Sequence, residues 1–271
     1  MIVFWMGKIN GLMKKVLIGG MVFFNSWIAH APETFVEKNP NQFKTIVLDP
    51  GHSDYYRGKG YVNEAKYNLK VALNLKEKFE KEGYGVFLTR KDGKNVNDRL
   101  RKNGDLNGDG RINLEDEILA RNNFSKYYDA DLFLSLHFDY VKSDTSSKTQ
   151  IIYYGLSDKK NLIDRKKNFS KYENLNYFNR ESADFARDLS VFYRRKGIKT
   201  ENYAADLGVL FFNQADKAVL IELDNLYNSR IRKKVETEKG IEEYANNLFE
   251  CLIGYEREKK GGLNFEDKFV N

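Results

Sequence analysis

The 271-residue sequence contains little cysteine, proline or histidine. Its single cysteine, Cys251, excludes an internal disulfide framework and a cysteine-rich zinc module, so a metal site would need histidine and carboxylate ligands. Only three prolines and twenty glycines accompany 41% hydrophobic residues, which excludes collagenous, low-complexity and disordered chains. The length suits one sizeable α/β domain and is short for two. We therefore expect a chain that folds around a packed core.

The sequence also lacks a strong excess of one charge. Lys and Arg number 45 and Asp and Glu 39, for a formal net charge of +6, and no basic stripe of the kind that binds nucleic acid is evident. A mildly basic protein would concentrate near an anionic polymer such as a bacterial envelope, but a solvated surface without a partner explains the charge equally well. We expect no nucleic-acid partner.

The first 31 residues have the pattern of an export signal. Basic residues, an apolar run and a small-residue exit follow one another: Lys8, Lys14 and Lys15, then 16–28, then Ala29, His30 and Ala31. The apolar run is short for a transmembrane helix. We expect residues 1–31 to be either a signal peptide or an uncleaved N-terminal anchor, and both alternatives place the domain in the periplasm, the cell envelope or the exterior of a bacterium.

After the leader, apolar runs alternate with amphipathic stretches. Strands are expected at 45–49, 86–89, 131–136, 150–154 and 218–222, and helices at 64–82, 115–128, 182–196 and 241–252. In the first helix, Ala65, Leu69, Ala72 and Leu73 are expected to share the buried face, with Gly83 as the cap. The alternation predicts a single three-layer α/β domain, with a mostly parallel, twisted sheet and helices on both faces.

The expected domain spans residues 44–256. The polar stretch 158–181 is interpreted as a surface insertion, and residues 257–271 as a polar C-terminal tail.

Two histidines remain once the leader is set aside, and both directly follow apolar runs. His52 ends TIVLDPGH, His137 ends DLFLSLH, Glu222 ends AVLIE, and Glu64 begins the first helix. Because the carboxyl ends of strands line the ligand crevice of an open α/β sheet, we expect these four groups to converge. Two neutral imidazoles and one carboxylate form a three-ligand zinc set, and a second carboxylate can act as a base. Taken singly, each residue is better explained as an ordinary core or surface group.

These motifs resemble those of the zinc-dependent N-acetylmuramoyl-L-alanine amidases of the type 3 class. The family's motifs correspond here to DPGH at Asp49–His52, to Glu64, to GVFLTR at Gly85–Arg90, to ADLFLSLHFD with His137, and to AVLIE with Glu222. The resemblance implies that His52, Glu64 and His137 bind zinc and that Glu222 is the catalytic residue, which activates water or relays protons. It also implies the bond that is cleaved, the amide between N-acetylmuramic acid and L-alanine of the peptidoglycan stem peptide.

The segment DLNGDGRINLED, residues 105–116, fills the ligand positions of an EF-hand loop. Oxygen ligands fall at positions 1, 3, 5, 7, 9 and 12, namely Asp105, Asn107, Asp109, the Arg111 carbonyl, Asn113 and Asp116. The pattern also resembles one dockerin repeat, and Asp at the last position has a shorter reach than the usual Glu. We expect this inserted loop to bind calcium, and the alternative is a polar turn that binds nothing.

Together these features predict an exported zinc amidase that acts on peptidoglycan, with Zn²⁺ and Ca²⁺ as cofactors, in cell-wall remodelling or daughter-cell separation. Peptidoglycan is the expected partner, a protein activator is a further one, and the membrane is contacted only through an uncleaved leader. Two alternatives stay open: a non-catalytic envelope-binding protein with an amidase-like fold, and a zinc peptidase that cuts within the stem peptide.

Overall fold

The computed structural model describes residues 43–57, 63–98, 104–155, 179–211 and 213–260. The expected leader, residues 1–31, lies outside the described residues, as does most of the expected insertion 158–181. The last helix extends to Lys260, into the segment expected as a polar tail. Among the helices of the described residues, none combines the length and the apolar character that crossing a membrane requires.

Six strands form one sheet, in the order β2-β1-β3-β6-β4-β5. Their bounds are β1 Thr45–Pro50, β2 Gly85–Leu88, β3 Leu132–Asp139, β4 Thr149–Tyr154, β5 Thr200–Ala205 and β6 Lys217–Asn225. Neighbouring strands run parallel except for β4 and β6, which are antiparallel. The expected α/β domain with a mostly parallel sheet is therefore confirmed.

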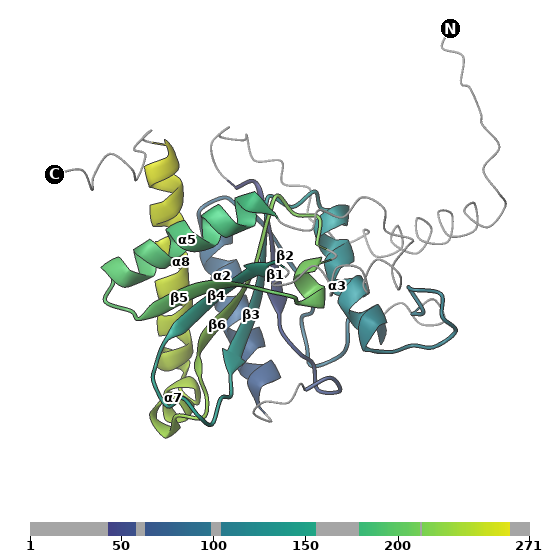
Figure 1. Ribbon diagram of the computed structural model, residues 1–271, viewed down its shortest axis with the longest axis horizontal. Coiled ribbons are helices and arrows are strands. Elements are labelled where there is room, and N and C mark those ends of the chain that lie inside the picture. The colour runs from purple at the N-terminus through teal and green to yellow at the C-terminus, as the bar shows by residue number, and fades with distance from the viewer. Residues whose placement is uncertain (1–42, 58–62, 99–103, 156–178, 212, 261–271) are drawn as a thin grey trace, which may run out of the picture. The chain divides into compact units, whose positions relative to one another are not determined.

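Helices cover both faces of this sheet (Figure 1). Their bounds are α2 Glu64–Lys81, α3 Leu114–Tyr127, α5 Arg180–Arg195, α6 Gly208–Phe211, α7 Ser229–Val235 and α8 Glu238–Lys260. The two faces have separate hydrophobic cores: α2, α5 and α8 pack on one, and α3 and α6 on the other. Successive side chains of β1 point to opposite faces of the sheet. Ile46 and Leu48 therefore pack in the core beside α2, α5 and α8, and Val47 packs in the core beside α3 and α6.

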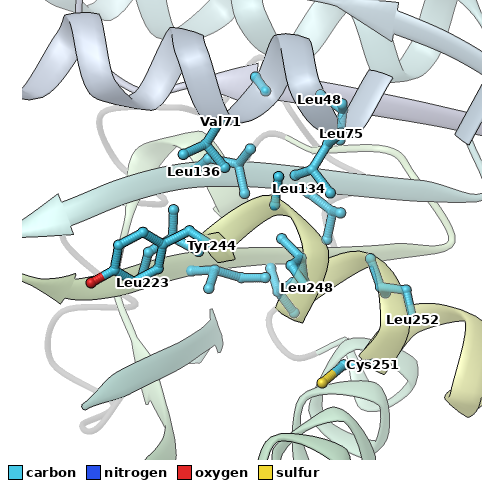
Figure 2. Close-up of a cluster of buried hydrophobic side chains, with 14 of the residues drawn as sticks. Leu48, Val71, Leu75, Leu134, Leu136, Leu223, Tyr244, Leu248, Cys251 and Leu252 are labelled. Atoms are coloured by element: carbon cyan, nitrogen blue, oxygen red, sulfur yellow. The ribbon is translucent and has the colours of Figure 1, made fainter. Parts of the chain in front are cut away.

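The larger core lies between the sheet and the pair α2 and α8. Figure 2 shows Leu48 and Leu134 of the strands beside Leu75 of α2 and Leu248 of α8. All four side chains are fully buried. This packing fixes α2 against the sheet, and with it Glu64 at the helix's first position.

The sequence pattern of α2 explains its ends and part of its buried face, since Ala65 and Ala72 are buried as expected and Leu69 is half-buried. Glu64 lies in the first turn and basic residues in the last turn, as the helix dipole favours. The expected cap Gly83 has a φ of +87°, the left-handed conformation in which glycine follows a helix. The expectation for Leu73 was wrong, since it is 43% exposed. The buried stripe is centred on Val71 and Leu75, and a residue two positions from each lies on the opposite side of a helix.

We expect Leu248→Ala to lower the free energy of unfolding by about 2–5 kcal/mol, because it leaves a cavity between α8 and the sheet. Leu73→Ala is the matched control on the exposed side of α2 and should change stability by less than about 0.5 kcal/mol. Urea unfolding followed by circular dichroism measures both. Equal losses for the two variants would contradict this assignment of the core.

Candidate metal centre and active site

The carboxyl ends of β1, β3 and β6 meet at one edge of the sheet. β1 pairs Pro50 with Leu136 of β3, and β3 pairs His137 with Glu222 of β6. His52 follows β1 in the next loop, and Glu64 begins α2 above the same edge. The four residues singled out in the sequence thus come from four different elements and lie at one edge of the sheet.

The two histidines contact one carboxylate oxygen. His52 Nε2 and His137 Nδ1 each lie 3.2 Å from Glu64 Oε1, and the imidazole rings are nearly perpendicular, with centroids 4.7 Å apart. Within the described part of the chain, these are the only three His, Cys, Asp or Glu side chains whose ligand atoms all lie within 4.8 Å of one another. Two ring nitrogens and one carboxylate oxygen are the donor set of a zinc site with an open position, so the residues present fit zinc.

The protonation states suit metal binding. Burial raises the pKa of Glu64, but hydrogen bonds from His137 and His52 outweigh it and hold the pKa at about 2. Burial lowers the pKa of His137, which favours the neutral imidazole that binds metals. Asn68 Nδ2 also donates to Glu64 Oε1, at 3.3 Å, and fixes the carboxylate from the next turn of α2.

The backbone of the DPGH segment is shaped to bring the histidines together. A Cβ atom at Gly51 would lie 2.1 Å from His137 Nε2, so only glycine leaves room for that imidazole. The next residue, His52, has a φ of +60°, in the left-handed region that non-glycine residues seldom adopt. Gly51 N donates to Leu136 O at 2.8 Å and continues the pairing of β1 with β3 past the end of the strand.

Glu222 lies beside His137 but does not belong to the group of three candidate metal ligands. As the register partner of His137 in β6, it projects from the same face of the sheet. Its Oε2 atom is buried and has no hydrogen-bond partner among the described residues. Burial, followed by the nearby charges of Glu64 and Asp139, raises the pKa of Glu222 well above its usual range. Glu222 can therefore hold a proton where Glu64 cannot.

A buried charge cluster that the sequence analysis missed lies between β1 and α3. Arg121 Nη1 is 2.7 Å from Asp49 Oδ1, and Arg121 Nη2 is 2.8 Å from Glu117 Oε1. Arg90, the last residue of GVFLTR, is also fully buried. Burial raises the pKa of Asp49, but Arg121 and the hydroxyls of Thr89 and Ser135 outweigh it and leave the pKa below its usual value. The sequence signal was an arginine directly after a buried strand.

The candidate calcium ligands lie in one loop and in the first turn of α3, where their side chains bind backbone N–H groups. Asp105 accepts from Gly108, Asp109 and Gly110, and Asp109 Oδ1 accepts from Arg111 N. Asp116 accepts from Leu106, Asn107 and Asn113, and Asn113 Oδ1 caps α3. In this arrangement the three aspartates do not form a converging ligand group of the kind that His52, Glu64 and His137 form.

The Asp49 pair predicts how stability depends on pH. Because the folded-state pKa is depressed, its stabilisation is present above the unfolded value of about 3.9 and is lost as pH falls through the folded value. We expect Asp49→Asn to cost about 3–5 kcal/mol at pH 7 and less at pH 3. Urea unfolding across this range measures the difference, with Glu77→Gln as an exposed control. A pH-independent difference for Asp49→Asn would refute the prediction.

Comparison with curated proteins finds a cell wall amidase that matches part of this chain. Probable cell wall amidase LytH of Staphylococcus aureus is 39% identical over 92 residues, which cover 32% of this chain and 31% of that protein. This chain therefore spans about a third of the length of the curated relatives that it matches.

Solved structures share the fold. The CwlD amidase of Clostridioides difficile, solved in complex with the GerS lipoprotein, has a TM-score of 0.58 at 22% identity and covers 80% of this chain and 99% of its own. The catalytic domain of CwlV, an N-acetylmuramoyl-L-alanine amidase from Bacillus (Paenibacillus) polymyxa, has a TM-score of 0.54 at 19% identity and covers 78% and 97%. The model of the family described as N-acetylmuramoyl-L-alanine amidase matches residues 46–253, and the chain belongs to that family.

Proposed function

We propose that this chain is an exported zinc hydrolase that cleaves the amide bond between N-acetylmuramic acid and L-alanine in peptidoglycan. The observation that carries the proposal is the meeting of His52, Glu64 and His137 at one sheet edge, with Glu222 beside them, in a member of the amidase family. A cell wall amidase among the relatives supports the choice of substrate.

Each residue has a distinct part in the proposed reaction. His52, His137 and Glu64, whose ligand atoms lie close together, would hold the metal. Zinc in such a site supplies Lewis-acid chemistry, which polarises a substrate carbonyl and lowers the pKa of water. Glu222 takes up a proton at its carboxylate as water attacks and returns it to the leaving amine, a role supported by its raised pKa and its unpaired Oε2.

The proposed enzyme acts outside the cytoplasm. Residues 1–31 direct the chain out of the cytoplasm or anchor it, and residues 44–256 form the catalytic domain. The insertion 158–181 and the tail 257–271 are accessory to it. A protein activator belongs to the proposal because the CwlD amidase of Clostridioides difficile was solved in complex with a lipoprotein.

The decisive test is mass spectrometry of the products released from purified peptidoglycan. With zinc, the wild-type protein should release stem peptides that begin with L-alanine. A zinc chelator should abolish their release, and Glu222→Gln should lower kcat by about 10²–10⁴-fold, because the proton carrier is lost while the metal ligands stay. Glu201→Gln, in the edge strand β5, is a matched control that should keep activity.

The products also separate the alternatives. Fragments cut within the stem peptide would identify a peptidase instead of an amidase. If the folded, zinc-loaded protein and an added activator bind peptidoglycan without releasing any product, the chain is an envelope-binding protein and the proposal fails.

We also propose that the loop 105–116 binds calcium through Asp105, Asn107, Asp109, the Arg111 carbonyl, Asn113 and Asp116. The oxygen-rich register of the loop supports this proposal. Calcium would tie the loop to the first turn of α3, because Asp116 is itself the third residue of that helix. Glu117, the next residue, accepts from Val96 and Asn97 and pairs with Arg121. Order in the loop would thus extend to the buried charge cluster.

Calorimetry tests the calcium proposal. With free zinc held constant, calcium should raise the Tm above that measured with a calcium chelator, because an ion that binds only the folded state stabilises it. Asp109→Asn keeps the side-chain shape but removes one charge, so it should weaken this response. The same Tm with calcium and with the chelator would leave the loop as a polar turn.

A further inference from the structure

Two buried arginines hold three consecutive carbonyl groups of the DPGH segment. The donors come from two different segments: Arg90 follows β2, and Arg121 belongs to α3. The bonds are Arg90 Nε to Pro50 O at 2.8 Å, Arg90 Nη2 to Gly51 O at 2.9 Å, Arg121 Nη1 to Pro50 O at 3.0 Å and Arg121 Nη2 to His52 O at 2.7 Å. Each carbonyl from residue 50 to residue 52 is thus fixed by a guanidinium group.

This segment carries a metal-ligand candidate in a conformation that needs outside support. His52 has a φ of +60°, and backbone in the left-handed region persists where its surroundings fix it. The bond from Arg121 to His52 O holds the carbonyl of that very residue. A third donor, Asn68 Nδ2 at 3.1 Å from Gly51 O, connects the same segment to α2.

Arg90 also connects two of the three segments that supply candidate ligands. Its Nη2 atom donates both to Gly51 O and, at 2.6 Å, to Ala65 O in the first turn of α2, next to Glu64. Its Nη1 donates to Asp92 O at 2.9 Å. Every hydrogen bond of Arg90 among the described residues goes to a backbone carbonyl. The guanidinium therefore fixes the spacing between the His52 segment and the start of α2.

Arg121 differs because carboxylates offset its charge. Asp49 and Glu117 accept from it at 2.7 and 2.8 Å, and its remaining donors are free to bind Pro50 O and His52 O. The planar guanidinium has five N–H donors in a fixed arrangement, whereas a lysine ammonium has three on a flexible stem. Lysine would keep the charge at either position but could not make the same set of bonds.

We propose that Arg90 and Arg121 are positioning residues, which hold His52 and the first turn of α2 in metal-binding geometry through the carbonyls of residues 50–52. This inference rests on the proposed zinc centre. Groups that orient metal ligands without touching the metal change metal affinity by about 10–100-fold when they are replaced.

The test uses Arg90→Lys and Arg121→Lys in the full chain, with folding checked by circular dichroism. Zinc affinity is measured by competition with a chromophoric chelator, and ligand geometry by the visible absorption of the Co²⁺-substituted protein. Each variant should bind zinc about 10–100-fold more weakly and show altered Co²⁺ bands. Leu248→Ala is the control: it destabilises the fold without touching the site, and its zinc affinity and Co²⁺ spectrum should match the wild type.

The outcomes separate this inference from the proposed function. Wild-type zinc affinity and Co²⁺ spectra in both folded lysine variants would overturn the positioning role and leave the metal centre intact. A wild-type protein that binds neither metal would overturn the metal centre and the positioning role together. Should Arg121→Lys fail to fold, Arg90→Lys decides alone, because its guanidinium has no carboxylate partner among the hydrogen bonds described.

Discussion

The parallel pairing of β1 with β3 is the constraint on which the site depends. Its register places Pro50 opposite Leu136, so the chain leaves both strands at the same level and their next residues can meet. The bond from Gly51 N to Leu136 O extends this pairing by one residue, and the missing side chain at Gly51 makes room for His137. A slip of one residue would turn His137 to the opposite face, toward α2 and α8.

The two faces of β3 differ in polarity at this edge of the sheet. Toward α2 and α8, β3 presents only apolar side chains, which include Leu134, Leu136 and Phe138. Toward α3, the same strand presents Phe133, then Ser135 and His137, so its carboxyl-terminal half is polar. The apolar face fixes the strand by packing, while Ser135 donates to Asp49 at 2.8 Å in the charge cluster. The polar residues of the candidate site thus lie on one face of β3, and the apolar residues on its other face pack in the core.

Much of the fold and the site could be predicted from the sequence because strong apolar runs end in polar residues. TIVLDPGH and DLFLSLH mark both the strands and the histidines that follow them. The edge strand β5 escaped prediction because Glu201, Tyr203 and Ala204 are exposed and no apolar alternation marks it. The hydrogen bonds of Arg90 and Arg121 could not be predicted for another reason. Each arginine donates to a backbone carbonyl about 40 or 70 positions away, and the residue pattern does not identify that partner even where a buried strand precedes the arginine.

Glu64 and Glu222 of the candidate site occupy opposite electrostatic environments, and this difference supports the separate roles proposed for them. Glu64 accepts from His52, His137 and Asn68, and its pKa lies near 2, so it stays ionised, which its proposed role as a metal ligand requires. Glu222 has burial without compensating donors, and the charge of Glu64 itself adds to the upward shift of its pKa. A pair of carboxylates whose pKa values are pushed apart by their surroundings is how acid–base roles divide in hydrolytic sites. The charge of the candidate ligand Glu64 thus supports the role proposed for Glu222, and the register that pairs Glu222 with His137 brings the two carboxylates close together.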